Sequence, residues 1–278
     1  MTSSPQALQA NDADDTNDAN LANVENAAND AIESDEIKVR QSFNGGLKSL
    51  VAAVVIALFV ITFVVQAFQI PSGSMEKTLL IGDYVLVDKV HFGQGGLWDM
   101  LMPYREIHRG DIVVFHYPVD PSQHFVKRVI GLPGDHVRLR EATVFINGQP
   151  LHEEYAIHTV RAFDFYRDNF PADIDTTGNM NTAWHSALAR YVQHGELVVP
   201  QDKFFVMGDN RDQSSDSRYW GFVPRQAIVG QPLVVYLSVR EQPVVGVNEP
   251  KDKLARSAHF LTHFWELPRW NRMFHLVR

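Results

Sequence analysis

The sequence predicts a mainly β fold, an antiparallel β-rich extracytoplasmic domain with a small inserted lobe, preceded by one N-terminal transmembrane helix. Three observations predict it. An uncharged apolar segment lies near the N-terminus, short runs of β-branched residues with period two follow it, and those runs do not alternate with helical patterns. The 278 residues, 45% of them apolar and 21% charged, suffice for a sizeable core and exclude a wholly disordered chain.

An acidic segment opens the chain. The first 36 residues contain nine Asp or Glu, no Lys or Arg, and no sustained apolar period, so we expect residues 1–45 to form a disordered cytoplasmic tail. The whole chain carries a net charge of −8, and without this segment the remainder carries +1. A near-neutral remainder gives no electrostatic basis for nucleic-acid binding. The absence of cysteine excludes disulfides, a Cys nucleophile and thiolate metal sites.

The apolar segment predicts a membrane anchor over residues 46–70. No charged residue lies between Lys48 and Glu76, and a helix over 49–68 would be about 30 Å long, the thickness of the hydrocarbon core of a bilayer. A cleavable signal peptide is the alternative, but the run is longer than usual and a long segment precedes it.

Basic residues set the expected orientation of this anchor. Lys38, Arg40 and Lys48 precede it, and no basic residue follows it until Lys77. Because basic residues favour the cytoplasmic side, we expect a single-pass protein of the inner (cytoplasmic) membrane with its N-terminus in the cytoplasm. Everything after residue 70 then lies on the extracytoplasmic side.

Period-two runs predict the strands of the domain that follows. They occur at 83–88, 111–115, 126–130, 137–139, 143–146, 203–207 and 232–237. Three of them start after a Gly-Asp pair suited to a turn, and Asn147-Gly148 predicts a hairpin turn. These runs divide the β domain into two parts, 71–151 and 197–240.

Two further segments differ from the β domain. Residues 152–196 are rich in His, Asp, Asn and aromatic residues with weak periodicity, and we expect an inserted lobe there. Residues 241–278 mix aromatic side chains with Arg269, Arg272 and Arg278. Two interpretations of this last segment stay open: it lies at the membrane–water interface, or it packs on the domain as a helix.

The turn at 71–75 (PSGSM) contains two serines, and a serine becomes a nucleophile only when a base accepts its proton. A lysine can be that base when burial lowers its pKa. Lys127 lies in an apolar strand, on the same face as Phe125 and Val129. The alternative is an edge-strand lysine whose amine reaches water.

Lys77 is a second candidate base. Residues 74–77 (SMEK) match the S-x-x-K spacing of penicillin-binding proteins and β-lactamases. The other two motifs of those enzymes, S-D-N and K-T-G, fail at 215–217 (SDS) and 77–79 (KTL), and their helical fold conflicts with the β pattern.

The polar loop at 208–221 alternates charges of both signs, which favours a loop held by its own ion pairs. A calcium loop is the alternative, but Arg211 interrupts the oxygen ligands and no EF-hand spacing is present. A zinc motif beginning at His152-Glu153 would need histidine where the chain has Ala156. We therefore expect no metal and no cofactor.

Taken together, these motifs resemble bacterial type I signal peptidases, membrane-bound serine proteases that remove signal peptides from exported proteins. The resemblance rests on four blocks in the order of that family. They are PSGSM at 71–75 with TL at 78–79 and GD at 82–83, RGDIVVF at 109–115, KRVIGLPGD at 127–135, and GDNRD at 208–212 followed by Ser214, DSR at 216–218, WG at 220–221 and VP at 223–224.

The resemblance implies a Ser–Lys dyad without histidine. Ser74 would be the nucleophile and Lys127 its general base. Ser72 would assist the oxyanion hole with its hydroxyl, beside the backbone N–H of Ser74, and Ser214 would orient the Lys127 amine through a hydrogen bond. Met75 would contact substrate and keep the site dry. The resemblance also implies structural ion pairs among Asp209, Asp216, Arg128 and Arg218.

It further implies the substrate and setting. Secretory preproteins with Ala-x-Ala sites would bind as extended peptides, and the enzyme would act as a monomer at the lipid bilayer, with no nucleic-acid partner. One position departs from the family, which usually has proline where this chain has Lys77, and we expect that lysine to be exposed and inert. An inactive homologue serving as a membrane scaffold, or a protease dedicated to one partner, are the alternatives.

Overall fold

The computed structural model describes residues 45–59, 65–90, 105–160, 162–172, 180–240 and 267–277. The chain divides into two compact units, Met1–Val60 and Ile61–Arg278. In the first unit, residues 45–59 form an α-helix with exposed apolar side chains such as Leu50, Ile56 and Leu58. The predicted acidic tail lies outside the described residues, apart from its last residue. No helix in the described ranges is both long and apolar enough to span a bilayer.

The structure corrects the end of the predicted anchor. Residues Val65–Gln69 form strand β1 rather than helix, and β1 pairs antiparallel with β2 (Asp83–Asp88) from Val65↔Asp88 to Gln69↔Tyr84. This pairing satisfies the backbone of residues that a helix would otherwise include. The first part of the apolar run therefore forms a helix, and its last part forms an edge strand of the β domain.

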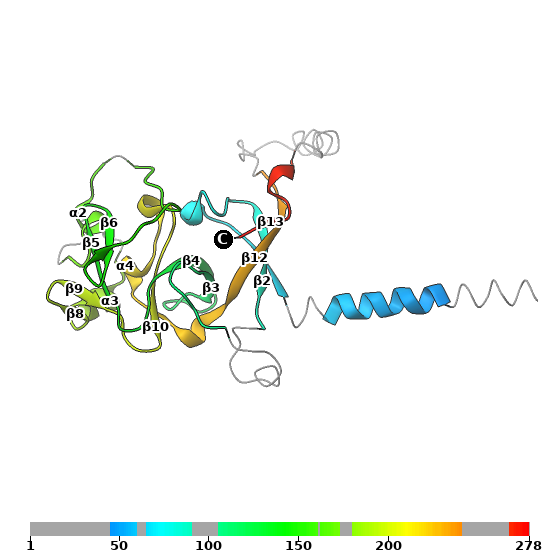
Figure 1. Ribbon diagram of the computed structural model, residues 1–278, viewed down its shortest axis with the longest axis horizontal. Coiled ribbons are helices and arrows are strands. Elements are labelled where there is room, and N and C mark those ends of the chain that lie inside the picture. Colours follow the sequence, from blue (N-terminus) through cyan, green and yellow to red (C-terminus); the bar gives the residue numbers. More distant parts are fainter. Residues whose placement is uncertain are drawn as a thin grey trace, which may run out of the picture. The chain divides into compact units, whose positions relative to one another are not determined.

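The larger sheet of the second unit is antiparallel, with the strand order β1-β2-β12-β3-β4-β10-β11 and β13 paired to β12 (Figure 1). Its remaining strands are β3 (Ile112–His116), β4 (His124–Gly131), β10 (Lys203–Met207), β11 (Val223–Pro224), β12 (Ile228–Ser238) and β13 (His275–Leu276). The alternating burial along β2 follows from its period-two sequence, because successive side chains point to opposite faces. The predicted strands of this sheet are confirmed.

A smaller sheet has the order β7-β6-β5-β9-β8. It contains β5 (His136–Arg140), β6 (Thr143–Ile146), β7 (Gln149–Pro150), β8 (Val192–Gln193) and β9 (Glu196–Val198). Asn147 and Gly148 both have positive φ between β6 and β7, as a tight hairpin turn requires, so the predicted turn is confirmed.

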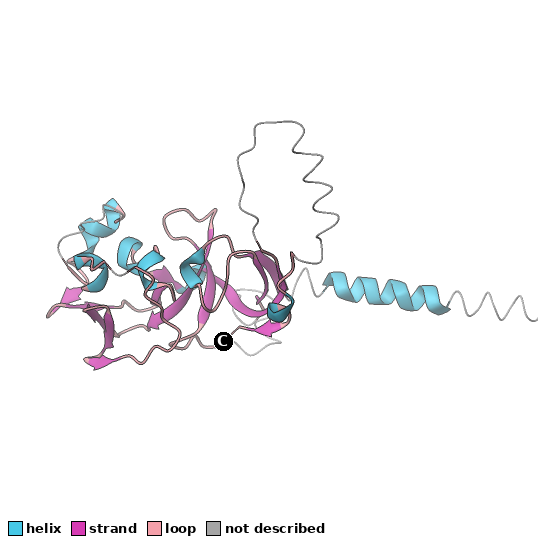
Figure 2. Cartoon of the chain, turned by 90° about the horizontal axis from the view of Figure 1, so that it is seen from above, coloured by secondary structure: helices cyan, strands magenta, loops and turns pink. Residues whose placement is uncertain are grey.

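Short helices accompany these sheets, and Figure 2 shows that strands and loops make up most of the second unit. They are η2 (Gly73–Met75), α2 (Phe165–Asp168), α3 (Thr182–Leu188), η4 (Arg211–Gln213), α4 (Ser217–Trp220), η5 (Arg225–Ala227) and η7 (Trp270–Arg272). Figure 1 shows α2 and α3 beside the smaller sheet, at the opposite end of this unit from β2 and β13.

Two predicted boundaries change. The smaller sheet joins β5–β7, which precede residue 152, to β8 and β9, so the inserted segment is part of a larger lobe that begins at β5. The last described residues, 267–277, form η7 and the short strand β13 on β12 instead of a helix. Trp270 and Phe274 remain exposed there, so the interfacial interpretation stays open.

Two apolar clusters place the site between them. The larger one unites β3, β4 and β10 with the smaller sheet and its helices, and includes Val129, Phe205 and Trp220. The smaller one lies under β1, β2 and the turn that contains η2, and includes Met75 and Leu79. Adjacent residues of β3 and β4 contribute to opposite clusters, so the segments around Ser74 and Lys127 are fixed by packing on both sides.

Candidate active site

Ser74 lies in the single 3₁₀ turn η2, which follows β1. Backbone hydrogen bonds between Ile70 and Asp83 (2.8 Å) and between Gly82 and Ile70 (3.0 Å) close the base of this loop. Inside it, Leu79 N–H donates to the Met75 carbonyl at 2.8 Å. Ser74 is 7% exposed, so the loop presents its hydroxyl at the floor of a depression rather than at the surface.

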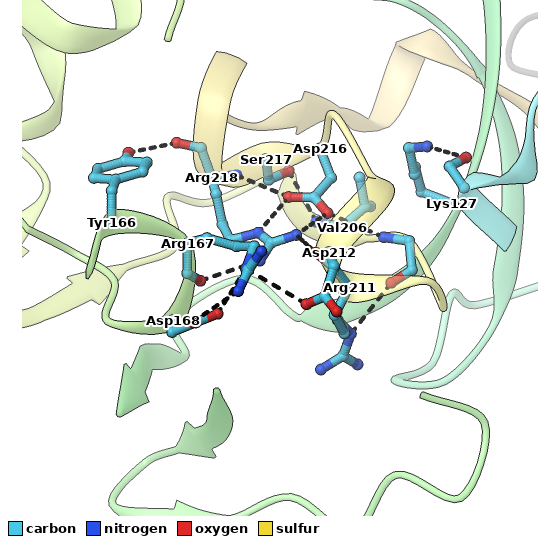
Figure 3. Close-up of polar contacts among 12 residues, drawn as sticks. Lys127, Tyr166, Arg167, Asp168, Val206, Arg211, Asp212, Asp216, Ser217 and Arg218 are labelled. Atoms are coloured by element: carbon cyan, nitrogen blue, oxygen red, sulfur yellow. Dashed lines mark hydrogen bonds and ion pairs between the residues drawn. The ribbon is translucent and has the colours of Figure 1, made fainter. Parts of the chain in front are cut away.

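Lys127 lies in β4, opposite Val113 of β3. Its Nζ is 2.5 Å from the Oγ of Ser74. Figure 3 shows the Lys127 amine directed at its hydroxyl partner, on the far side of Asp216 from Tyr166. The side chain is 4% exposed, and the Phe125 ring centroid lies 5.7 Å from the amine. Burial disfavours the ammonium form, and this outweighs the attraction of the Asp216 carboxylate, so the pKa of Lys127 falls from 10.5 to about 8. The pair that the sequence singled out is therefore in hydrogen-bond contact.

Ser72 and Met75 flank the nucleophile. The Oγ atoms of Ser72 and Ser74 are 3.4 Å apart, which places a second hydroxyl beside the reacting atom. Met75 is 1% exposed and packs against Leu79 and Ile70, so it also walls the site against water.

Ser214 does not make the hydrogen bond expected of it. Its Oγ is buried without a well-aligned partner among the described residues, and it approaches the Asp216 carboxylate closely enough to help lower the pKa of that group. The loop that carries Ser214 comes so near because Gly208 has no side chain: a Cβ there would lie 2.3 Å from Ser214 Oγ and 2.5 Å from the Ser74 carbonyl oxygen. Among the described residues, Ser214 Oγ therefore makes no hydrogen bond to Lys127.

Two buried ion pairs lie around Ser74 and Lys127, formed by the four charged residues that the resemblance singled out without assigning partners. Arg128 donates to both carboxylate oxygens of Asp209 at 2.8 and 2.7 Å, and Arg218 donates to both of Asp216 at 2.9 Å. All four side chains are at most 4% exposed. Since paired geometry satisfies both charges, each pair holds its loop without leaving an uncompensated ion beside Lys127.

Three contacts around these pairs were not identified as site features from the sequence. Thr78 Oγ1 donates to Asp209 at 2.6 Å, and the backbone N–H of Asn210 donates to the Ser74 carbonyl at 3.0 Å. The polar loop at 208–221 is therefore hydrogen-bonded directly to the segment that carries Ser74. The Arg128 guanidinium lies 4.0 Å from the Tyr155 ring centroid, a stacking contact that burial strengthens. Tyr155 belongs to the segment predicted as a separate lobe, so nothing in its local pattern tied it to the site.

Lys77 is exposed, as predicted, and its amine donates to the backbone carbonyl of Glu154. Its φ is +89°, a left-handed conformation that proline cannot adopt. The backbone at residue 77 therefore excludes the proline that the family usually has at this position.

A groove of about 430 Å³ opens onto the dyad. Its walls combine β1 and the following turn with the start of β4, and they include Phe68, Ile70, Met75, His124 and Phe125. In the described part of the chain, no group of three or more His, Asp or Glu side chains is arranged to hold a metal ion. The groove is a largely apolar channel that leads to one hydroxyl and one amine.

Comparisons with known proteins agree with this arrangement. Residues 44–237 match the family described as "Signal peptidase, peptidase S26". The chain is 36% identical over 209 residues to a signal peptidase I of Pseudomonas fluorescens, covering 69% of this chain and 71% of the relative. It is 34% identical to a probable signal peptidase I-2 of Synechocystis sp., covering 80% and 84%.

Among solved structures, a crystal structure of a signal peptidase I from Enterococcus faecalis V583 is 32% identical and has a TM-score of 0.30, covering 46% of this chain and 97% of that one. The family match extends from the helix to β12, a range that contains Ser74 and Lys127. The chain belongs to the signal peptidases of peptidase family S26, and it is a serine endopeptidase.

Proposed function

We propose that this enzyme removes signal peptides from exported preproteins with a dyad in which Ser74 is the nucleophile and Lys127 the general base. One observation carries the assignment: a lysine amine removed from water lies 2.5 Å from a serine hydroxyl at the floor of an apolar groove. The names of the relatives support the substrate class.

The first half of the reaction forms an acyl-enzyme. Neutral Lys127 Nζ accepts the proton of Ser74 Oγ as the oxygen attacks the scissile carbonyl carbon. The tetrahedral intermediate collapses when the lysine ammonium returns this proton to the leaving amine. In the second half, Lys127 Nζ accepts a proton from water as the water oxygen attacks the ester carbonyl carbon. The ammonium then returns this proton to Ser74 Oγ as the ester bond breaks and the cleaved signal peptide leaves.

The developing oxyanion needs donors that are already in place. The Ser72 hydroxyl, 3.4 Å from Ser74 Oγ, is one, and the backbone N–H of Ser74 is assigned as the other. Ser214 Oγ is buried and has no hydrogen-bond partner among the described residues, so its hydroxyl is available to orient the Lys127 amine during turnover.

The substrate is expected to lie extended along β1, which is the outermost strand of the larger sheet as described. An edge strand offers unpaired backbone groups that an added peptide strand can bond. Because apolar side chains line the groove beside Ser74, small apolar residues such as alanine fit at the positions before the cut.

The membrane setting follows from the N-terminal segment. The helix over 45–59 exposes Leu50, Val54 and Leu58, and the uncharged run continues beyond it to residue 75. We assign this segment to the inner membrane, with the catalytic unit on the extracytoplasmic side. The unit would act as a monomer, since both dyad members and their ion pairs come from one chain.

Cleavage of a precursor with an Ala-x-Ala site by the detergent-solubilised full chain tests the proposal. Ser74→Ala should abolish cleavage, because no other described hydroxyl contacts the amine as Ser74 does. Lys127→Ala should lower the rate by about 10²–10⁴-fold, the usual contribution of a general base. Lys77→Ala should leave it unchanged.

The opposite pattern for the two lysines would move the base to Lys77. Cleavage that persists in Ser74→Ala would refute Ser74 as the nucleophile, whereas no cleavage by the folded unmodified chain would refute the proposed activity and favour a scaffold.

A further inference from the structure

We propose that the lobe containing α2 and α3 is a positioning device for the general base: Tyr166, Trp184 and the backbone of Arg167 hold Arg218, which in turn fixes Asp216 beside Lys127. The inference rests on the proposed function of Lys127 and concerns residues that do not touch the substrate. It gives the lobe a task in the reaction.

The main chain of Arg218 is held from two helices of the lobe. Its carbonyl oxygen accepts the hydroxyl of Tyr166 at 2.6 Å, from α2, and the indole N–H of Trp184 at 3.1 Å, from α3. Tyr166 is fully buried and Trp184 is 6% exposed, so water does not compete for these bonds. Figure 3 shows Tyr166 and Lys127 on opposite sides of the Arg218–Asp216 pair.

The Arg218 side chain is shared between the lobe and the catalytic loop. Nη1 donates to the Arg167 carbonyl at 3.1 Å, whereas Nη2 donates to the Arg211 carbonyl at 2.7 Å and to Asp216. The guanidinium is 1% exposed, and its fork geometry fixes the Asp216 carboxylate. Displacing Arg218 therefore displaces Asp216, the charged group with the largest electrostatic effect on the Lys127 amine.

Packing joins α3 and α4 at one further point. Gly221 has φ +95°, and a Cβ on it would lie 2.7 Å from the Trp184 ring. The indole thus contacts the chain immediately after α4 as well as the carbonyl of Arg218. There is no free space here in which α4 could shift while the lobe stays in place.

The lobe is itself firmly attached. Residues 139 and 170 exchange two backbone hydrogen bonds, at 2.7 and 3.2 Å, which connect α2 to β5. The N–H of Ala142 donates to the Asp168 carbonyl at 2.9 Å, and Arg167 Nε lies 2.8 Å from the Asp168 carboxylate. The position of α2 is therefore set by the smaller sheet.

Electrostatics explain why this position matters for the base. The charged groups that act on Lys127 are Asp216 and Arg218 from the α4 region and Asp209 after β10, itself paired to Arg128. Asp216 and Asp209 favour the ammonium form, and Arg218 opposes it. If Arg218 retreats from Asp216, the carboxylate acts on Lys127 with less compensation, and less neutral amine remains at a given pH.

The test is the pH dependence of kcat/KM for a soluble Ala-x-Ala peptide, measured with the full chain in detergent. Tyr166→Phe removes one hydroxyl and keeps the ring. We expect the acid limb of its profile to move to higher pH. Near pH 7, kcat/KM should fall about threefold to tenfold, because a displacement of one pH unit changes kcat/KM tenfold on the acid limb. On the alkaline plateau, kcat/KM should return to the value of the unmodified enzyme.

Tyr191→Phe is the matched control. Tyr191 belongs to the same lobe, and its ring packs on Trp184 and Phe222. Its profile should superimpose on that of the unmodified enzyme. Trp184→Phe, which removes the second donor to Arg218 and keeps an aromatic ring, should move the limb in the same direction as Tyr166→Phe, and it replaces that variant if Tyr166→Phe does not fold.

A merely structural role would lower kcat/KM by the same factor at every pH. That result, or an unchanged limb in both folded variants, would overturn the inference and leave the dyad intact. Activity surviving in Ser74→Ala would instead refute the proposed function itself, so the two failures are distinguishable.

Discussion

At the scale of the residue, Lys127 combines a costly burial with a chemical advantage. An amine taken out of water loses hydration that its neighbours only partly replace, and its pKa falls to about 8. In the proposed mechanism, the same burial that destabilises the ammonium lets Lys127 act as a base near neutral pH without a histidine. Strain of this kind is stored where function needs it and is offset by the rest of the fold.

The pH dependence of cleavage follows from that pKa. Only the neutral amine can accept the Ser74 proton, so kcat/KM should rise about tenfold per unit at pH values below about 8 and level off above it. Initial rates on a peptide at substrate concentrations far below KM, from pH 6 to 10, measure this limb. A limb near the ordinary lysine value of 10.5 would mean that the amine is hydrated in the working enzyme.

Replacing Lys127 by methionine should abolish cleavage yet stabilise the fold. Below about pH 8 the lysine is charged in both the folded and the unfolded chain, and burying the charge costs roughly 3 kcal/mol for a displacement from 10.5 to about 8. Between those two values only the unfolded chain keeps the proton, so this cost shrinks as the pH rises and is gone above about 10.5.

Urea unfolding at pH 7 and pH 10.5 measures the difference in the free energy of unfolding between Lys127→Met and the unmodified chain. An advantage of methionine that is equal at both pH values would show that packing, not charge burial, separates the two side chains.

At the scale of the element, the last described segment ties down the nucleophile turn. Arg272 donates to the Thr78 carbonyl at 3.0 Å and to Asp83 at 2.6 Å, and Asp83, which is fully buried, also accepts from Ser238. These hydrogen bonds hold the pKa of Asp83 below its ordinary value against the opposing effect of burial. η7 therefore fastens the end of the loop that presents Ser74.

Arg272→Ala should leave Asp83 buried with fewer cationic partners and destabilise the chain by about 3–5 kcal/mol, the cost of breaking a buried ion pair. Thermal or urea unfolding at pH 7 gives the value. Arg140→Ala, at the exposed end of β5, is the matched control and should change stability by less than about 0.5 kcal/mol. Equal effects of the two substitutions would contradict the role given to Arg272.

Gly221→Ala should also be strongly destabilising, by at least about 2 kcal/mol. The positive φ and the 2.7 Å approach to Trp184 both oppose a side chain there, and each effect alone costs of the order of 1–3 kcal/mol. The unfolding midpoint measures it. Gly110 has a similar positive φ, but a Cβ there would meet open space. Gly110→Ala should therefore lose less stability, and the difference between the two losses gives the contribution of the clash with Trp184.

The elements differ in how readily the sequence predicts them. Strands such as β3 and β4 carry β-branched runs whose period is visible locally, and Asn147-Gly148 marks its turn. The sequence predicts helix over β1 because a continuous apolar run has the same composition in a helix and in a strand, and only the pairing of β1 with β2 distinguishes the two. β13 has two residues, too few for any period.

The site residues also divide into those that the sequence identifies and those that only the three-dimensional structure reveals. Ser74, Lys127 and the two ion pairs could be assigned because the resemblance carries them residue by residue. The contact of Ser214 with Asp216 and the stacking of Tyr155 on Arg128 depend on side-chain orientation and on long-range packing, which no local pattern encodes.

At the scale of the whole molecule, the dyad, its ion pairs and their supports all lie in the second unit. A chain lacking residues 1–60 should therefore fold and cleave a soluble peptide much as the full chain does. It should lose roughly 10²-fold or more on a precursor inserted in vesicles, because anchoring raises the effective concentration of enzyme near its substrate. Parallel assays of the two chains on both substrates measure this, and equal losses on both would mean that the helix supports the fold.

The distances along the chain between contacting groups have a consequence for the cell. The serine and its lysine are 53 residues apart, and Thr78 meets Asp209 across 131 residues. Thr78 and the Arg128–Asp209 pair can meet only after residue 209 has been synthesised, and the Asp216–Arg218 pair only after residue 218. The complete surroundings of the Ser74–Lys127 pair therefore form late in synthesis, when most of the catalytic unit already exists.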